Sequence, residues 1–193
     1  MNYLAHAYLS FNKPEIVVGN IISDFVKGKK RFDFPGPIQK GIMLHRSIDI
    51  FTDEHAVTKK AKQVFKPVVG LYAGAFMDIV YDHFLALDAN EFSKETLLEF
   101  SLSVYETLDQ YQSVSPERFM RVFYYMRHEN WLYNYRSLNR IEKSFAGLLY
   151  RAKYLTENAA VFDCFQKNYE YLHECYNVFF PEVKKHAFGQ LAL

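Results

Sequence analysis

Polar residues spaced four apart interrupt the apolar stretches in the first half of this chain. They form three pairs, and a histidine directly follows the third: Asn20 and Asp24, His45 and Asp49, and Asp78 and Asp82 with His83. On an α-helix, residues four apart share a face, so each pair would direct two ligand-type side chains the same way. Metal sites inside helical bundles are built from side chains on facing helices. The spacing therefore favours an all-α fold with a polar site inside it.

The rest of the chain also favours helices over strands. There is no Asn-Gly or Asp-Gly turn, and only 8 glycines punctuate the 193 residues. Residues 158–179 carry apolar side chains at alternating steps of three and four, which predicts one long helix ending before Pro181. Residues 71–87 predict a buried helix, and the basic stretch 27–37 predicts a loop. We expect a single-domain helical bundle over residues 1–193.

Charge and cysteine content narrow the environment and the partners. The 23 basic and 22 acidic residues give a net charge of +1, so nothing overall favours nucleic acid or an anionic membrane. Cys164 and Cys175 would lie about 16 Å apart on the predicted long helix, which is too far for a disulfide. No apolar run approaches the ~20 residues of a membrane span, and the first residues lack signal-peptide features. We predict a cytoplasmic protein of undetermined oligomeric state.

The aspartates within residues 71–87 need a partner. A buried, unpaired carboxylate is costly and would normally take up a proton, so burial of Asp78 and Asp82 requires a cation or a dense hydrogen-bond network. A single divalent metal would offset the charge of both aspartates. The alternatives are that these carboxylates face solvent, or that they bond Arg46 or a tyrosine hydroxyl.

His45, Arg46 and Asp49 follow one another on the second candidate helix. His45 and Asp49 would ligate a metal together, or Asp49 would orient the histidine. Arg46 offers a planar donor for phosphate oxygens, although an Arg/Asp pair at this spacing is also ordinary on a surface. His6 lies in an apolar start, where a lone histidine is usually a satisfied core residue. The N, H, D and R types together suit Mn²⁺, Mg²⁺ or Fe²⁺ better than structural zinc.

Five strings of residues resemble a known family. They are 2–6 (NYLAH), 19–25 (GNIISDF), 41–53 (GIMLHRSIDIFTD), 78–85 (DIVYDHFL) and 131–136 (WLYNYR). Their order and spacing are similar to those of the acyl carrier protein phosphodiesterase family, also called ACP hydrolase. The resemblance spans most of the chain, but its C-terminal third matches only in helical character and length.

The resemblance implies a helical, divergent relative of the HD-domain phosphohydrolases. It implies that the chain removes 4′-phosphopantetheine from holo acyl carrier protein with Mn²⁺. The chain has no His-Asp dipeptide, so ligands cannot be assigned by analogy with HD enzymes. The expected metal ligands are Asp24, His45, Asp78 and Asp82, followed by His6, Asp49 and His83. Among catalytic roles, we expect Arg46 to clamp phosphoryl oxygens, His83 to act as general acid, and Asp82 to hold that histidine's tautomer.

The sequence allows two roles for its basic segment and two rival functions. Acyl carrier proteins are small and acidic, so Lys27, Lys29, Lys30 and Arg31 either dock the partner or form a solvated loop. One rival function is metal-dependent hydrolysis of another phosphoester, such as a nucleotide. The other is a non-catalytic helical binding module whose polar pairs are structural.

Overall fold

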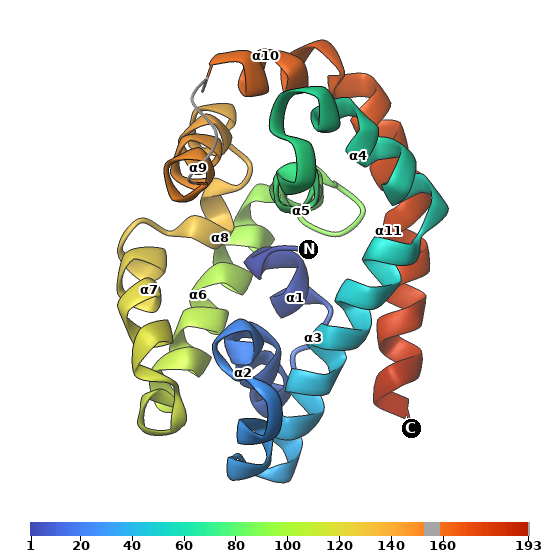
Figure 1. The fold of residues 1–193 in the computed structure, drawn as a ribbon. Helices are drawn as coiled ribbons and strands as arrows, with labels where there is room; N and C mark the ends of the chain where they lie inside the picture. Colours follow the sequence, from blue (N-terminus) through green and yellow to red (C-terminus); the bar gives the residue numbers. More distant parts are fainter. Residues whose placement is uncertain (153–158, 193) are drawn as a thin grey trace.

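The protein is helical throughout the part of the chain that the computed structural model describes, residues 1–152 and 159–192. Within these residues it forms α-helices and short 3₁₀ segments and no strand (Figure 1), which confirms the all-α prediction. The α-helices are α1 (Tyr3–Tyr8), α2 (Pro14–Ile22), α3 (Gly36–Glu54), α4 (Ala56–Val69), α5 (Ala73–Leu87), α6 (Lys94–Gln110), α7 (Glu117–His128), α8 (Trp131–Asn134), α9 (Leu138–Arg151), α10 (Ala159–Lys167) and α11 (Tyr169–Ala192). The 3₁₀ segments are η1 (Ser23–Phe25), η2 (Gly28–Asp33), η3 (Gly70–Tyr72) and η4 (Gln112–Val114).

The short helix α1 lies near the centre of the molecule, between α2 and α5 (Figure 1). Helix α3 packs against α2 on one side and against the long α11 on the other. The buried apolar side chains of these helices, together with those of α4 to α10, form one hydrophobic cluster. The HD-like relationship and the single-domain boundary at 1–193 stay predictions.

Two glycines allow α2 and α3 to approach each other closely. A Cβ placed on Gly19 would lie 2.1 Å from the carbonyl oxygen of Ile38, and one placed on Gly41 would lie 2.5 Å from that of Ile16. No side chain fits at either position without moving backbone. The contact stands one residue before Asn20 and four residues before His45, so it fixes the spacing of the elements that carry the polar residues.

The C-terminal region differs from the sequence prediction. The expected long helix is two helices, α10 and α11, and Asn168 at the break donates its side-chain amide to the carbonyl of Cys164 at 2.8 Å. Cys164 and Cys175 therefore lie on different helices, and both are free thiols as predicted. The end expected at Pro181 is wrong, because α11 continues through this residue and buries Phe179, Phe180 and Val183. Residue 158, the first of the predicted stripe, lies outside the described residues.

Two further segments qualify the sequence expectations. The predicted loop 27–37 contains the 3₁₀ segment η2. Residues 56–87 form one helical stretch that is long and apolar enough to cross a membrane by length and composition alone. In the structure this stretch turns at Gly70, whose φ is +55°, and α4 and α5 pack against each other. Both helices contribute buried side chains to the hydrophobic cluster of the fold.

Candidate metal centre

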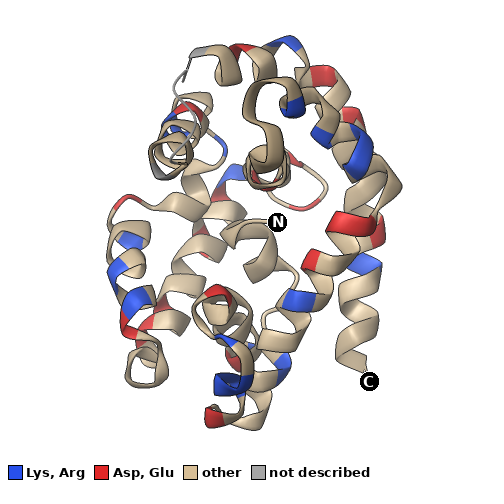
Figure 2. Cartoon of the chain, viewed as in Figure 1, with Lys and Arg blue, Asp and Glu red and all other residues tan. Residues whose placement is uncertain are grey.

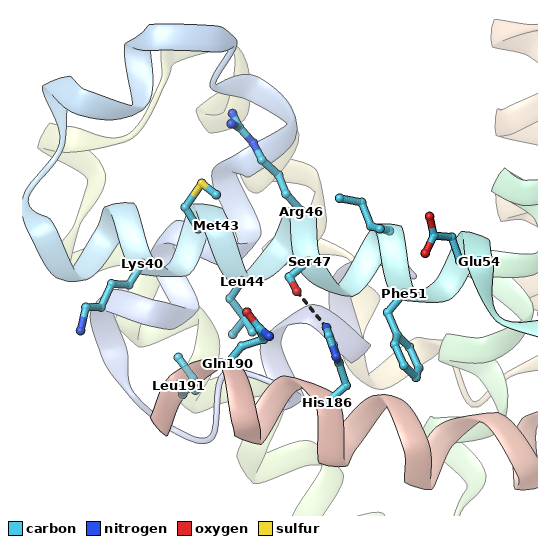
Figure 3. A pocket seen from close by; sticks show the side chains of 11 residues that line it. Lys40, Met43, Leu44, Arg46, Ser47, Phe51, Glu54, His186, Gln190 and Leu191 are labelled. Carbon is cyan, nitrogen blue, oxygen red and sulfur yellow. Dashed lines mark hydrogen bonds between the residues drawn. The ribbon is translucent and has the colours of Figure 1, made fainter. Parts of the chain in front are cut away.

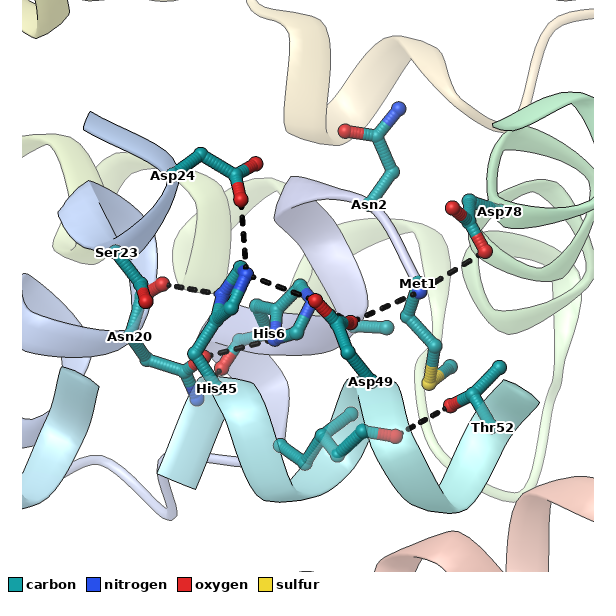
Figure 4. Close-up of polar contacts among 12 residues, drawn as sticks. Met1, Asn2, His6, Asn20, Ser23, Asp24, His45, Asp49, Thr52 and Asp78 are labelled. Atoms are coloured by element: carbon teal, nitrogen blue, oxygen red, sulfur yellow. Dashed lines mark hydrogen bonds and ion pairs between the residues drawn. The ribbon is translucent and has the colours of Figure 1, made fainter. Parts of the chain in front are cut away.

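Two buried histidines from different helices face each other at the centre of the polar cluster (Figure 4). His6 of α1 and His45 of α3 stack with ring centroids 3.9 Å apart and planes inclined by 16°. Asp49, one turn after His45 on α3, places carboxylate oxygens 3.3 Å from Nε2 of His6 and 3.1 Å from Nε2 of His45. Asp24 of η1 adds an oxygen 3.2 Å from Nε2 of His45. Two imidazoles and two carboxylates thus converge on one point.

Asn20 fixes the orientation of both rings. Its side-chain oxygen accepts a hydrogen bond from Nδ1 of His6 at 2.8 Å, and its backbone carbonyl accepts one from Nδ1 of His45 at 2.8 Å. The Asn20 amide nitrogen donates to the carbonyl of His6 and to the hydroxyl of Ser10, which settles which end of the amide is the acceptor. Because neither acceptor oxygen can donate, both histidines carry their proton on Nδ1 and turn Nε2 toward the carboxylates.

This arrangement calls for a positive charge between the rings and the carboxylates. In a neutral imidazole protonated at Nδ1, Nε2 has a lone pair, and a lone pair does not bond a carboxylate oxygen. Nε2 of His6 is buried and has no hydrogen-bond partner. One ligand atom from each of His6, His45 and Asp49 falls within 4.8 Å of the others, as expected for groups around one ion. The donor set therefore fits a divalent cation.

The titration properties of the cluster reflect the same crowding. Burial, reinforced by the neighbouring His45, lowers the pKa of His6 to about 4. Burial alone would also lower the pKa of His45, but hydrogen bonds to Asp24 and Asp49 outweigh it and raise that pKa to about 9. Burial likewise opposes ionisation of Asp49, yet the two imidazoles hold its pKa below the usual range. Two stacked rings cannot both be cationic, so a single positive charge is shared among four groups.

Asp78 lies at the edge of this cluster and faces the amino group of Met1. The nitrogen lies 3.0 Å from Asp78 and 3.6 Å from Asp49. Burial would lower the pKa of this amine, but the two carboxylates outweigh that effect and raise it to about 10. Asp78 thus shares a cation with Asp49 and has no contact with either histidine among the interactions of the described residues.

Asp82, predicted both as a ligand and as a partner of His83, instead accepts three backbone hydrogen bonds at the start of α1. Its carboxylate is fully buried and bonds the N–H groups of Asn2 at 3.2 Å, Leu4 at 2.7 Å and Ala5 at 3.3 Å. These groups would otherwise lack partners at a helix N-terminus. Burial raises the pKa of Asp82 to about 7 although the amine of Met1 and the three N–H groups favour its charged form. This placement matches the dense-network alternative considered for Asp82.

His83 also lies outside the cluster, although Asp82 precedes it directly. Its Nδ1 donates to the carbonyl of Tyr135 at 2.7 Å, and its Nε2 bonds the hydroxyl of Tyr169 at 3.0 Å. The ring is fully buried and packs edge-on against Phe165. Consecutive residues on a helix point about 100° apart, so Asp82 faces α1 while His83 faces the helices that carry these aromatic partners.

Arg46 follows His45 on α3 but extends away from the histidine pair. Its guanidinium donates to the carbonyl of Val26 at 3.0 Å, which ties the segment after Asp24 to α3. The other four of its five N–H groups form no hydrogen bond within the described part of the chain. The residue therefore has donors available for an anion, and it also lines the cavity drawn in Figure 3.

The cavity in Figure 3 is separate from this cluster. It has a volume of about 440 Å³ and lies between α3 and the end of α11, where Ser47 and His186 form a 2.8 Å hydrogen bond. Its lining includes Met43, Ile50 and Phe51 but none of the four converging ligands. Helix α3 thus presents His45 and Asp49 on one face and borders the cavity with another.

Comparison with known proteins places the chain in a family. A model of the family described as acyl carrier protein phosphodiesterase matches residues 1–183. The chain belongs to this family. Acyl carrier protein phosphodiesterases of Klebsiella pneumoniae and Serratia proteamaculans are 30% and 31% identical to it, in each case over 97% of both chains. One from Yersinia pestis is 29% identical over the same share. No solved structure gives a significant match to this chain.

The family assignment confirms the resemblance predicted from the five strings. Four of the strings supply the polar centre, with His6 from the first, Asn20 and Asp24 from the second, and His45 and Asp49 from the third. The fourth string contributes Asp78 at the edge. Ser10, which supports Asn20, lies in no string, and nothing in its sequence neighbourhood distinguishes it.

Proposed function

We propose that this protein is a metal-dependent phosphodiesterase that hydrolyses 4′-phosphopantetheine from holo acyl carrier protein and releases apo acyl carrier protein. The proposal joins the family membership with one structural observation: two histidines that bond Asn20 through Nδ1 turn their Nε2 atoms toward two carboxylates. The proposed ligands are His6, His45, Asp49 and Asp24, whereas Asp78 pairs with the amino group of Met1 at the edge of the centre.

The donor set agrees with Mn²⁺ as the proposed ion. It combines imidazole nitrogen with carboxylate oxygen and includes no thiolate, since Cys164 and Cys175 lie on α10 and α11. Mg²⁺ strongly prefers oxygen ligands, so two imidazoles favour Mn²⁺ or Fe²⁺ over it. When bound, such a cation offsets charge on a phosphoryl group and makes a water molecule more acidic.

The residues of the chain bind and orient the reacting groups. Asn20 accepts hydrogen bonds from Nδ1 of both histidines, which turns Nε2 of each ring toward the carboxylates where the cation would lie. Asp49 contacts Nε2 of both rings and so keeps the two nitrogens close to each other. Arg46 directs its remaining N–H groups to the non-bridging oxygens of the diester. The general-acid role predicted for His83 is not retained, because both of its ring nitrogens are engaged elsewhere.

The decisive experiment measures the mass of holo acyl carrier protein after incubation with the protein and Mn²⁺. Loss of the phosphopantetheine mass with wild type, and retention with Asp49→Asn, is the expected result. Thr52→Val is a matched control one turn away on α3, because the Thr52 hydroxyl donates to the carbonyl of Ile48 and bonds no group of the centre among the described residues. An unchanged mass with wild type would refute the assignment.

The same assay separates the rival functions. Turnover of a nucleotide or another small diester as fast as holo carrier protein would identify a broader metal phosphohydrolase. Failure to bind Mn²⁺, together with unfolding that chelators do not affect, would identify a non-catalytic module. The cytoplasm remains the predicted compartment.

A further inference from the structure

A strongly basic stretch of surface borders the metal centre. Residues 27–46 contain six Lys or Arg and a single Asp, in a chain whose net charge is +1. Lys27, Lys29, Lys30 and Lys40 are exposed, and Arg31 is half-buried. None of these five forms an ion pair with a carboxylate of residues 1–152 or 159–192. Their charge is therefore unneutralised.

Two arginines on α7 differ in this respect. On α7, Arg121 pairs with Glu117 at 2.5 Å, and Arg127 pairs with Asp109. Paired charges produce little field at a distance, whereas an unpaired group of one sign attracts an oppositely charged partner. Figure 2 shows Lys and Arg gathered where the chain passes from α2 to the start of α3.

Apolar side chains are exposed within the same stretch. Phe32 is 59% and Met43 is 46% exposed. The guanidinium of Arg31 lies 4.6 Å from the centre of the Phe32 ring, and η2 packs on α3. Met43 and Arg46 extend from the same side of α3 (Figure 3). Exposed apolar groups ringed by charge are typical of protein interfaces rather than of a merely solvated loop.

The stretch is also held against the open edge of the centre. Asp24 belongs to the cluster, Val26 is anchored to α3 by Arg46, and Lys27 follows at once. A partner lying on this surface would therefore be next to the exposed carboxylate side of the centre. We name the surface formed by Lys27, Lys29, Lys30, Arg31, Phe32 and Met43 the basic surface.

We propose that the basic surface docks an acidic, partly apolar helix of the acyl carrier protein, with acidic side chains on the lysines and apolar ones on Phe32 and Met43. The choice of partner rests on the proposed function, whereas the charge and exposure of the surface do not. Attraction of this kind speeds association and weakens with ionic strength, since the Debye length is only ~8 Å at 0.15 M salt.

The experiment measures the dissociation constant of apo acyl carrier protein, which has no diester to be cut. The variant is Lys27→Glu, Lys29→Glu, Lys30→Glu. Its matched control is Lys59→Glu, Lys60→Glu, Lys66→Glu, which reverses the same number of exposed lysines on α4. We expect the variant to raise the dissociation constant at least about tenfold, or about 1.4 kcal/mol, and the control to change it less than about twofold. Both should bind Mn²⁺ as wild type does.

The outcomes separate docking from catalysis. Wild type that binds apo carrier protein through the lysines but leaves holo carrier protein uncut would refute the proposed function and support the docking surface. Wild type that cuts holo carrier protein, with the variant binding as tightly as the control, would refute the docking surface alone. Absence of binding by wild type would refute it as well.

Discussion

The close contact between α2 and α3 predicts that Gly19→Ala damages both the fold and the metal centre. Non-bonded carbon atoms pack best at about 3.5–4.0 Å, so a Cβ lying 2.1 Å from the Ile38 oxygen is too close by more than about 1 Å. The obstacle is backbone in the first turn of α3 and cannot rotate away. Overpacking of this kind costs about 1–3 kcal/mol of unfolding free energy, and relief requires the two helices to separate.

Separation of the helices would act directly on the centre. The carbonyl of Asn20, the next residue, lies 2.8 Å from Nδ1 of His45 across the same contact. A shift of about 1 Å lengthens this bond beyond the ~3.2 Å limit of a good hydrogen bond and releases the ring. Loss of such a supporting bond typically lowers metal affinity 10–100-fold. We therefore expect Gly19→Ala to bind Mn²⁺ at least about tenfold more weakly than wild type.

Gly147→Ala provides the matched control. Gly147 is an exposed residue in α9, and an added Cβ meets nothing within 4 Å. Alanine favours helix by up to about 1 kcal/mol over glycine, so this variant should be more stable and bind Mn²⁺ normally. Urea unfolding followed by circular dichroism gives stability, and titration calorimetry gives affinity. If Gly19→Ala matched wild type in both measurements, the close contact would not be what positions the centre.

Three further predictions test the groups around the centre. Asn20→Ala removes three buried hydrogen bonds, so urea unfolding should show an unfolding free energy lower by about 3 kcal/mol. Calorimetry should show a 10–100-fold weaker Mn²⁺ affinity, and an unchanged affinity would refute the argument that Asn20 orients both rings. Asp82→Asn should lower stability by about 1–3 kcal/mol and leave the Mn²⁺ stoichiometry intact, whereas lost stoichiometry at unchanged stability would make Asp82 a ligand. In the metal-free protein, His45 with a pKa of about 9 stabilises the fold below pH 6.5 and loses that contribution as pH rises to 9. His6, with a pKa of about 4, destabilises the fold as pH falls from 6.5 to 4, so stability measured against pH should peak near 6.5 and decline on both sides.

Helical content and most of the central residues were predictable because both depend on local spacing. The pair at His45 and Asp49 shares one face of α3, as the four-residue spacing requires. The pair at Asn20 and Asp24 has a different geometry, since α2 ends before Asp24 and only η1 carries that carboxylate to the centre. Asn20 supports the histidines and ligates nothing in the cluster. Spacing thus identified the residues without distinguishing ligand from support.

The role of Asp82 could not be derived from its own helix. Its three partners belong to the first five residues of the chain, and the contact spans 77 to 80 positions in sequence. A buried carboxylate needs donors or a cation, and the sequence could not show that the start of α1 supplies the donors. His83 is similar, because Tyr135 and Tyr169 become its partners only through the packing of the C-terminal half.

The four proposed ligands differ in exposure, so one side of the centre faces the protein interior and the other faces solvent. The side chains of His6 and His45 are 3% and 7% exposed, while those of Asp49 and Asp24 are 41% and 70% exposed. The histidines therefore form the inner side of the centre and the carboxylates its outer side, with Asp24 the most exposed of the four. The chain leads from Asp24 directly to Lys27 and the basic surface. A bound divalent cation would offset the negative charge of Asp24 and Asp49, and under the proposed docking the lysines that follow Asp24 would add attraction for an acidic carrier.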